Sequence, residues 1–163
     1  IQIAFAQIEN DCAHLADNSI LPGREVMQAA GSRLLIIRTV FEENQPTRLQ
    51  VVSYRVVNGV FSRRQSVATR ELAVLDEDWQ RALNDAEEVP AITLQTGVSN
   101  IAMRTWTNGE SGWRIAGSEA STGSSAVSAV SALSNKKRTG LEIALQLQGN
   151  ALPMIKAFLL GAV

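Results

Sequence analysis

The sequence predicts an α+β domain in which a long N-terminal helix packs on antiparallel β-sheets. Residues 1–17 repeat apolar side chains at helical spacing, and two later stretches read as β-hairpins around an Asn-Gly pair. The chain then ends in a segment that alternates apolar and polar residues, as a half-buried strand does. With 163 residues, 45% of them apolar, one domain over 1–163 with its own core is expected.

The first element is a helix over residues 1–17, IQIAFAQIENDCAHLAD. Its apolar residues recur at spacings of four, three, four and three, which places them on one stripe. No capping residue precedes the pattern, so we expect the sequence to start inside a longer helix, of which 1–17 is the remnant. The stripe consists of Ile1, Phe5, Ile8, Cys12 and Leu15.

Two strands are expected next, over 32–41 and 48–57, with EENQPT at 42–47 as the turn between them. Both runs are rich in β-branched residues, which favour strands. Pro22-Gly23 separates them from the first helix by breaking the chain.

The pair Asn58-Gly59 predicts a two-residue type I′ turn, because both central residues of that turn need a positive φ. The resulting register places Tyr54, Val56 and Phe61 on one face, which we expect to be buried against the first helix. The opposite, wetter face is expected to carry Arg55, Ser62 and Arg64.

The second half begins with an expected short helix over 76–85, DEDWQRALND. Asp76 is its predicted cap, and Trp79 and Leu83, four residues apart, are its predicted anchors to the body. Further strands are expected over 91–94, 98–106, 141–147 and 151–160, with a hairpin turn at 108–112.

Residues 116–135 are rich in Ser, Ala and Gly, and they predict a loop insertion, taken as 116–138. A weak helical turn inside it is an alternative, since Val127, Val130 and Leu133 recur at three-residue spacing. We expect this insertion to be mobile in the isolated domain, and hydrogen exchange as slow as in the 141–147 strand would contradict that expectation.

The charge pattern argues against a broad basic surface for nucleic acid, because the net charge is −1. The basic clusters at 63–64 and 136–138 are short and are expected to be solvated. No apolar run of eighteen or more residues occurs, and the single cysteine excludes an internal disulfide.

No catalytic, metal or cofactor site is predicted. The only histidine, His14, lies on the polar flank of the first helix, and Cys12 lies on the apolar stripe, away from a base. The one acidic cluster lacks the alternating ligand spacing of a Ca²⁺ loop. It consists of Asp76, Glu77, Asp78, Asp85, Glu87 and Glu88. We therefore expect no hydrolase activity and no stoichiometrically bound metal.

Three blocks of sequence resemble the J-type minor pseudopilins of the bacterial type II secretion system, a branch of the type IV pilin-like superfamily. VVSYRVVNGVFSRR (51–64) resembles the tyrosine-containing hairpin of that family. TLQTGVSNIAMRTWTNGESGWR (93–114) resembles its next block, with a Gly97-Val98 step and a loop that closes on Trp113. LEIALQLQGNALPMIKAFLL (141–160) resembles its closing hairpin. The insertion is longer than that pattern, and the family's apolar start with an early Glu is not in this sequence.

The resemblance implies a pilin-like fold and a structural role without cofactors. It implies a protein made with a leader, cleaved by a prepilin peptidase and held in the bacterial inner membrane by a segment missing here, with its globular domain in the periplasm. Its partners would be the I- and K-type pseudopilins, and also the H type, in a complex at the pseudopilus tip that supports export of folded proteins.

Partner contacts are expected on the helix stripe, at Ile1, Phe5 and Ile8, because the sheets of a small domain cover only part of a long helix. The competing interpretation is that Phe5 packs in the domain's own core. Structural roles are expected for Cys12, Leu15, Tyr54, Asn58, Gly59, Phe61 and Trp113.

Three other functions stay open at this point. The nearest is a minor pilin of a type IV pilus, within the same superfamily. A periplasmic β-rich domain could instead bind a small apolar ligand in a barrel mouth. An unrecognised hydrolase would need a polar cleft centred on carboxylates or on His14.

Overall fold

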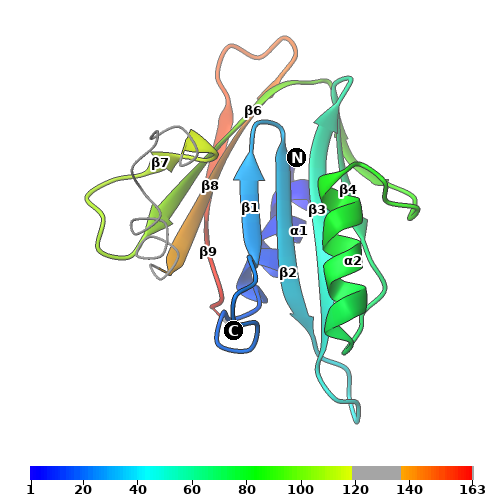
Figure 1. Cartoon of the computed structure of the whole chain (residues 1–163). Coiled ribbons are helices and arrows are strands. Elements are labelled where there is room, and N and C mark those ends of the chain that lie inside the picture. The colour runs from blue at the N-terminus through cyan, green and yellow to red at the C-terminus, as the bar shows by residue number, and fades with distance from the viewer. Residues whose placement is uncertain (119–136, 163) are drawn as a thin grey trace.

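Two antiparallel sheets make up most of the structure (Figure 1). The computed structural model describes residues 1–118 and 137–162. Sheet A has the strand order β1-β2-β3-β4-β5, and sheet B has the order β7-β6-β8-β9. The elements are α1 (Gln2–Ala13), β1 (Met27–Ala30), β2 (Arg33–Val40), β3 (Arg48–Val57), β4 (Val60–Gln65), α2 (Leu72–Leu83), β5 (Ile92–Thr96), β6 (Val98–Thr107), β7 (Arg114–Ile115), β8 (Arg138–Leu147) and β9 (Met154–Leu159).

The predicted α+β fold with a long, pilin-like N-terminal helix is wrong, because the described part of the chain is mostly β and its two helices are short. α1 has 12 residues and ends at Ala13. Beyond it the backbone bonds to β2 instead of continuing the helix: the Ala16 N–H donates to the Ile37 carbonyl at 2.8 Å. The Thr39 N–H donates to the His14 carbonyl at 2.9 Å. Strand-type bonding to β2 therefore replaces the last predicted helical turn.

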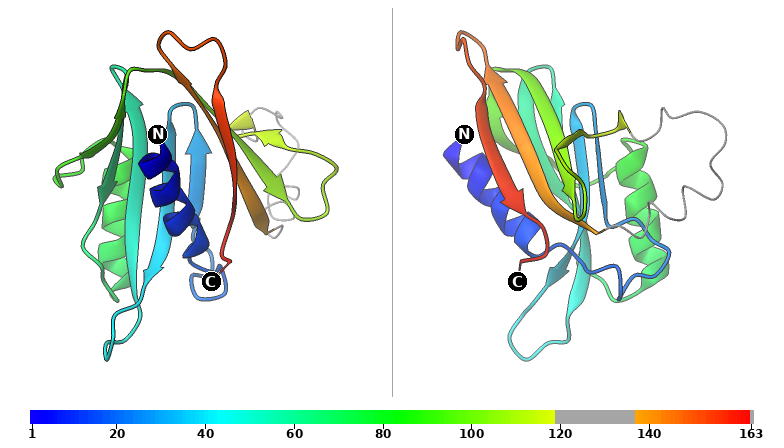
Figure 2. Two further views of the ribbon diagram at one scale, coloured as in Figure 1. Left: turned by 180° about the vertical axis from the view of Figure 1, so that it is seen from behind. Right: turned by 90° about the vertical axis from the view of Figure 1, so that its left-hand side faces the viewer.

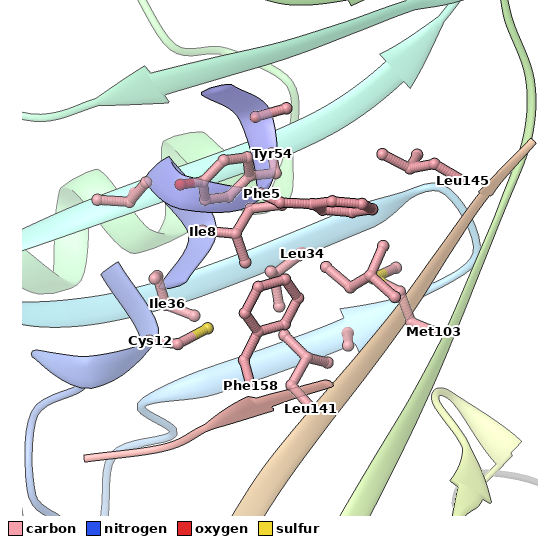
Figure 3. Packing of buried hydrophobic residues seen from close by; sticks show 14 of the residues in the cluster. Phe5, Ile8, Cys12, Leu34, Ile36, Tyr54, Met103, Leu141, Leu145 and Phe158 are labelled. Carbon is pink, nitrogen blue, oxygen red and sulfur yellow. The ribbon is translucent and has the colours of Figure 1, made fainter. Parts of the chain in front are cut away.

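Sheet A is the middle layer of the fold (Figure 2). α2 covers one of its faces, and α1 together with sheet B covers the other. The main core lies between sheet A, sheet B and α1, and a smaller core lies under α2. Figure 3 shows the main core, in which Phe5, Ile8 and Cys12 of α1 meet side chains from both sheets, among them Leu34, Met103 and Phe158.

The predicted hairpin is confirmed. Asn58 and Gly59 both have positive φ, 51° and 75°, and Val56 pairs with Phe61 as the two-residue turn requires. Tyr54 and Phe61 are buried, with their ring centroids 5.8 Å apart, in the cluster that includes α1. The hairpin face that carries Tyr54 therefore packs on the first helix, as the pattern predicted.

The opposite face of the hairpin is less exposed to solvent than predicted. Arg55 is buried, because α2 and the segment after it cover that face of sheet A. Arg63, which lies on the same face as Tyr54, is also buried, and this contradicts its assignment to a solvated basic cluster. Alternation placed Arg55 on the correct face, but it could not show that either arginine has buried acceptors.

The remaining strands follow the predicted segments, with shifted ends. The 141–147 segment lies inside β8, with Leu141, Ile143 and Leu145 buried, and β9 begins directly after Pro153. β1 was not predicted. Residues 119–136 of the predicted insertion lie outside the described residues, whereas residue 138 already belongs to β8.

α2 starts at Leu72, four residues before the predicted start. Asp76 is therefore inside the helix and does not cap it; its carboxylate accepts from Arg24 Nε at 2.8 Å. Trp79 and Leu83 pack against the smaller core, as expected of anchors. Among the described residues, neither helix has the length and apolar character needed to cross a membrane.

We predict that Gly59→Val destabilises the domain by about 1–3 kcal/mol, because a β-branched residue is strained at positive φ. Its Cβ would also stand 3.4 Å from the Val98 carbonyl oxygen. For a domain of this size the melting temperature should fall by about 2–4 °C per kcal/mol. Asn58→Gly is the matched control, since glycine adopts the same turn without strain. Equal melting temperatures for the two variants would contradict the type I′ assignment.

Candidate functional site

A buried carboxylate joins α1 to three strands of sheet A. Asp11 is fully buried, and both of its oxygens accept hydrogen bonds from sheet A. Arg38 Nη1 in β2 donates to Oδ1 at 2.6 Å, and Tyr54 Oη in β3 donates to Oδ2 at 2.5 Å. Arg63 in β4 donates from Nε to Oδ2 at 2.7 Å and from Nη2 to Oδ1 at 3.1 Å. One helix side chain thus binds three adjacent strands.

Two glutamines complete this group. Gln50 Oε1 accepts from Arg38 Nε at 3.0 Å, and its Nε2 donates to the Ser66 carbonyl at 2.6 Å. Gln65 Oε1 accepts from Arg63 Nη1 at 2.6 Å. Polar groups of a buried network must be satisfied together, and here each guanidinium has an anion and a neutral acceptor. We call this set the Asp11 cluster; it consists of Asp11, Arg38, Gln50, Tyr54, Arg63 and Gln65.

The environment fixes the protonation of the donors. Burial, followed by the charge of Asp11, raises the pKa of Tyr54 well above its usual value, so the phenol stays a donor. Burial by itself lowers the pKa of Arg63, but the hydrogen bonds and charge of Asp11 outweigh it and the pKa is raised overall. Both groups therefore keep their protons at every physiological pH.

A second group of arginines holds the C-terminal end of α2. Arg33 Nη1 donates to the Leu83 carbonyl at 2.6 Å, and Arg55 Nη2 donates to the Ala82 carbonyl. Cations at the last carbonyls of a helix complement its dipole. Glu87 accepts from the Ser53 hydroxyl at 2.5 Å and pairs with Arg55 at 3.3 Å. Burial lowers the pKa of Arg55, and the charge of Glu87 opposes that shift. This group fastens α2 to sheet A.

The prediction that Phe5 stays partly bare for a partner is wrong. Phe5 is only 8% exposed, and Ile8 is fully buried with it in the main core. The reason is that β9 lies beside α1 and supplies Phe158, whose ring centroid is 6.1 Å from that of Phe5. Ile1 is half-buried and packs against the same core. The competing interpretation, packing into the domain's own core, holds for Phe5 and Ile8.

The exposed side of α1 carries a different apolar residue. Ile3 is 78% exposed, and Ala6, one turn further along, is exposed as well. Sequence reasoning missed Ile3 because it is two residues away from the stripe members on both sides, off the helical period. It turns away from the core together with the polar residues of the helix.

The other residues predicted to be structural are placed as follows. Cys12 is fully buried, and Leu15 packs at the border of the main core. Trp113 lies over Gly140, where an added Cβ would stand 3.1 Å from the indole, and its ring centroid is 5.7 Å from that of Trp106. His14 forms the C-cap of α1, with Nδ1 2.8 Å from the Asn10 carbonyl. Cys12 and His14 do not form a nucleophile–base pair in this arrangement.

The described part of the chain carries no candidate metal centre. No group of three or more His, Cys, Asp or Glu side chains there is arranged to hold a metal ion. The two sheets are separate and open, so the barrel mouth expected of a small-ligand carrier does not form in these residues. Two surface depressions in the described residues are lined by residues 109–114 and by Arg24, Asp76 and Trp79.

Comparison of the sequence with protein-family models and with curated proteins gives no match.

Asp11 could have been suspected from the sequence. It lies three residues after Ile8 and four before Leu15, which puts it beside the apolar stripe of the helix. A carboxylate at such a position needs a buried partner. The alternation of the hairpin also places Arg63 on the same face as Tyr54 and Phe61, so the sequence contained a candidate partner for this carboxylate.

We predict that Asp11→Asn destabilises the domain by about 3–5 kcal/mol, because Arg38 and Arg63 then lose their shared buried anion. The measurement is urea unfolding followed by circular dichroism. Glu9→Gln, which breaks the exposed pair with Lys156 on the same helix, is the control and should cost less than about 1 kcal/mol. Similar losses for both variants would show that the Asp11 cluster does not hold α1.

We predict that Cys12 resists alkylation in the folded protein. Burial, helped by the charges of Asp11 and Glu9, raises the pKa of Cys12 from 9.0 to about 12, and only the thiolate reacts. The folded state holds this proton more tightly than the unfolded chain, so the associated stability is complete below pH 9. It is lost as the pH rises toward 12. Mass spectrometry after iodoacetamide treatment at pH 9, with and without urea, checks this; rapid labelling without urea would contradict it.

Proposed function

We propose that the protein is a structural minor pseudopilin of the type II secretion machinery, of the J type, and not an enzyme. In this proposal it joins the I- and K-type pseudopilins, and also the H type, at the tip of the pseudopilus. The complex supports pseudopilus assembly and the export of folded proteins across the outer membrane. The protein is held in the bacterial inner membrane as a single-pass protein, with the present domain in the periplasm.

The observation that carries the proposal is the joint between α1 and sheet A. In a pilus-like assembly, subunits associate through their N-terminal helices, so any load on the helix has to reach the globular domain. The Asp11 cluster connects α1 to β2, β3 and β4 through charged hydrogen bonds in the core. Breaking these buried hydrogen bonds would leave charged groups unpaired in the core, which is costly. The helix therefore resists movement relative to sheet A.

The C-terminal part of the chain, including β9, is also attached to α1. The Gly161 N–H donates to the Cys12 carbonyl at 2.9 Å, and Lys156 in β9 pairs with Glu9 at 2.9 Å. α1 therefore contacts sheet A through its buried side and sheet B through β9. A helix fixed to both sheets suits a subunit that is moved as one body.

The resemblance of the three sequence blocks supports the family assignment independently of this joint. The blocks coincide with the β3–β4 hairpin, the β5–β7 segment and the β8–β9 hairpin. Each block thus covers most of two neighbouring strands and the turn between them. The likeness and the joint together support the proposed function.

The test is co-purification with the I- and K-type pseudopilins of the same organism, by size-exclusion chromatography of the co-expressed globular domains. A stable complex is the expected result. Binding to minor pilins of a type IV pilus in place of the pseudopilins would move the protein to that machine. No complex with either set would overturn the proposal.

We predict that Ile3→Glu weakens that complex by about tenfold or more while leaving the melting temperature nearly unchanged. Ile3 is exposed in the isolated domain, and burying a large apolar side chain contributes roughly 1.5–3 kcal/mol. Val67→Glu, at an 80% exposed apolar position far along the chain, is the matched control. Phe5→Glu should instead lower the melting temperature sharply. Isothermal titration and thermal unfolding give the two readouts; equal binding by the Ile3 and Val67 variants would exclude Ile3 from the interface.

A further inference from the structure

The outer face of sheet B, the face turned away from sheet A, is apolar over most of the described strands. Alternation sends Leu141, Ile143 and Phe158 into the core and their neighbours outward. On the outward side Ile115 is 69% exposed, Ile155 57% and Leu159 73%. Neither helix covers it, because α1 lies beside β9 and α2 lies beyond sheet A (Figure 2). We define the outer face of sheet B by Ala102, Ile115, Ala144, Ile155, Ala157 and Leu159.

The registers order these residues in rows across the sheet. Ala102, Ala144 and Ile155 are direct neighbours in one row. In the next row Arg104 and Glu142 are paired across β6 and β8, with Ile115 and Ala157 at the two ends. These two rows combine small alanines with larger aliphatic side chains, and the Arg104–Glu142 ion pair lies in the second row. In the row beyond it Gly140 pairs with Trp106 and Leu159, and Trp113 lies over Gly140.

That ion pair has good geometry and still points outward. Arg104 Nε donates to Glu142 Oε1 at 2.7 Å; the arginine side chain is 46% exposed and the glutamate side chain 14% exposed. A cation and an anion side by side are complementary to the same pair turned by 180°. A two-fold axis near this row would place Arg104 opposite Glu142 of the partner subunit, and the reverse contact follows by symmetry.

We infer that two copies of this chain associate through the outer faces of their B sheets, around a two-fold axis near the Arg104–Glu142 pair. Sheets pack face to face at about 10 Å, and the alanine rows allow that approach. The aliphatic residues become buried. The arginine and glutamate side chains of the two copies form a network of four alternating charges. A second copy is favoured over an unrelated partner because the charge pattern of the face is complementary to itself.

The first test is the oligomeric state of the unmodified domain at rising concentration, measured by sedimentation velocity. A concentration-dependent dimer is expected. Ile155→Glu should raise its dissociation constant by about tenfold or more, because a carboxylate replaces an aliphatic side chain that becomes buried. Val67→Glu, at a more exposed apolar position away from sheet B, should leave the dissociation constant unchanged. Melting temperatures verify that both variants are folded.

The second test uses the charges. Arg104→Glu alone and Glu142→Arg alone each put like charges in contact across the axis, so each variant should be monomeric. Mixed together, the two variants should form a heterodimer, since each substituted side chain then meets an opposite charge. Förster resonance energy transfer between a donor-labelled and an acceptor-labelled variant measures this pairing.

Three outcomes would overturn the inference. A monomer at every concentration excludes the second copy as occupant of this face. A dimer that is insensitive to Ile155→Glu uses another surface. A dimer weakened by Ile155→Glu whose charge variants fail to pair when mixed lacks the proposed two-fold contact between Arg104 and Glu142 of the partner subunit. None of these results bears on binding to pseudopilins, which the Ile3 variant tests separately.

Discussion

The position of α1 depends on one buried carboxylate. Taking Asp11 out of water costs several kcal/mol, and only a complete set of donors offsets that cost. The donors come from three neighbouring strands. All of them reach the two oxygens at only one rotation of the helix about its axis and one position along that axis. Apolar packing of Phe5 and Ile8 alone would tolerate small slides of the helix along the sheet. The carboxylate removes that freedom, and the main core, including the contact with β9, is built around a helix fixed in this way.

The two faces of the β3–β4 hairpin show how sheet A holds two layers together. One face sends Tyr54 and Arg63 toward α1, and the other sends Arg55 toward α2. On both faces an arginine supplies the polar part of the contact, to a carboxylate on one side and to helix-end carbonyls on the other. The arginine stems also cover apolar surface, so each residue contributes packing as well as charge. The middle layer thus specifies the orientation of both helices.

The strands were predictable because their signals are local. The φ preference of Asn58-Gly59 sets the register of the hairpin, and alternation assigns the inward and outward residues of β8. The length of α1 was not predictable, because residues that continue a helical pattern bond to β2, which lies more than twenty residues further along the chain. For the same reason Phe5 was assigned to a partner: the ring that covers it, Phe158, belongs to the other end of the sequence. The Asp11 cluster also depends on such distant partners, although a carboxylate beside an apolar stripe was visible from the start.

The contact of Trp113 with Gly140 gives the domain an optical property. Two indoles with centroids 5.7 Å apart, nearly edge to face, are close enough for their electronic transitions to couple. Such coupling produces strong near-ultraviolet circular dichroism bands that depend on the mutual orientation of the rings. Both rings lie where β6 and the loop before β7 meet β8, and Gly140 leaves the room that Trp113 occupies. With Trp79 replaced by phenylalanine to remove the signal of α2, the spectrum of this pair would report changes at the surface of sheet B in solution, without any added label.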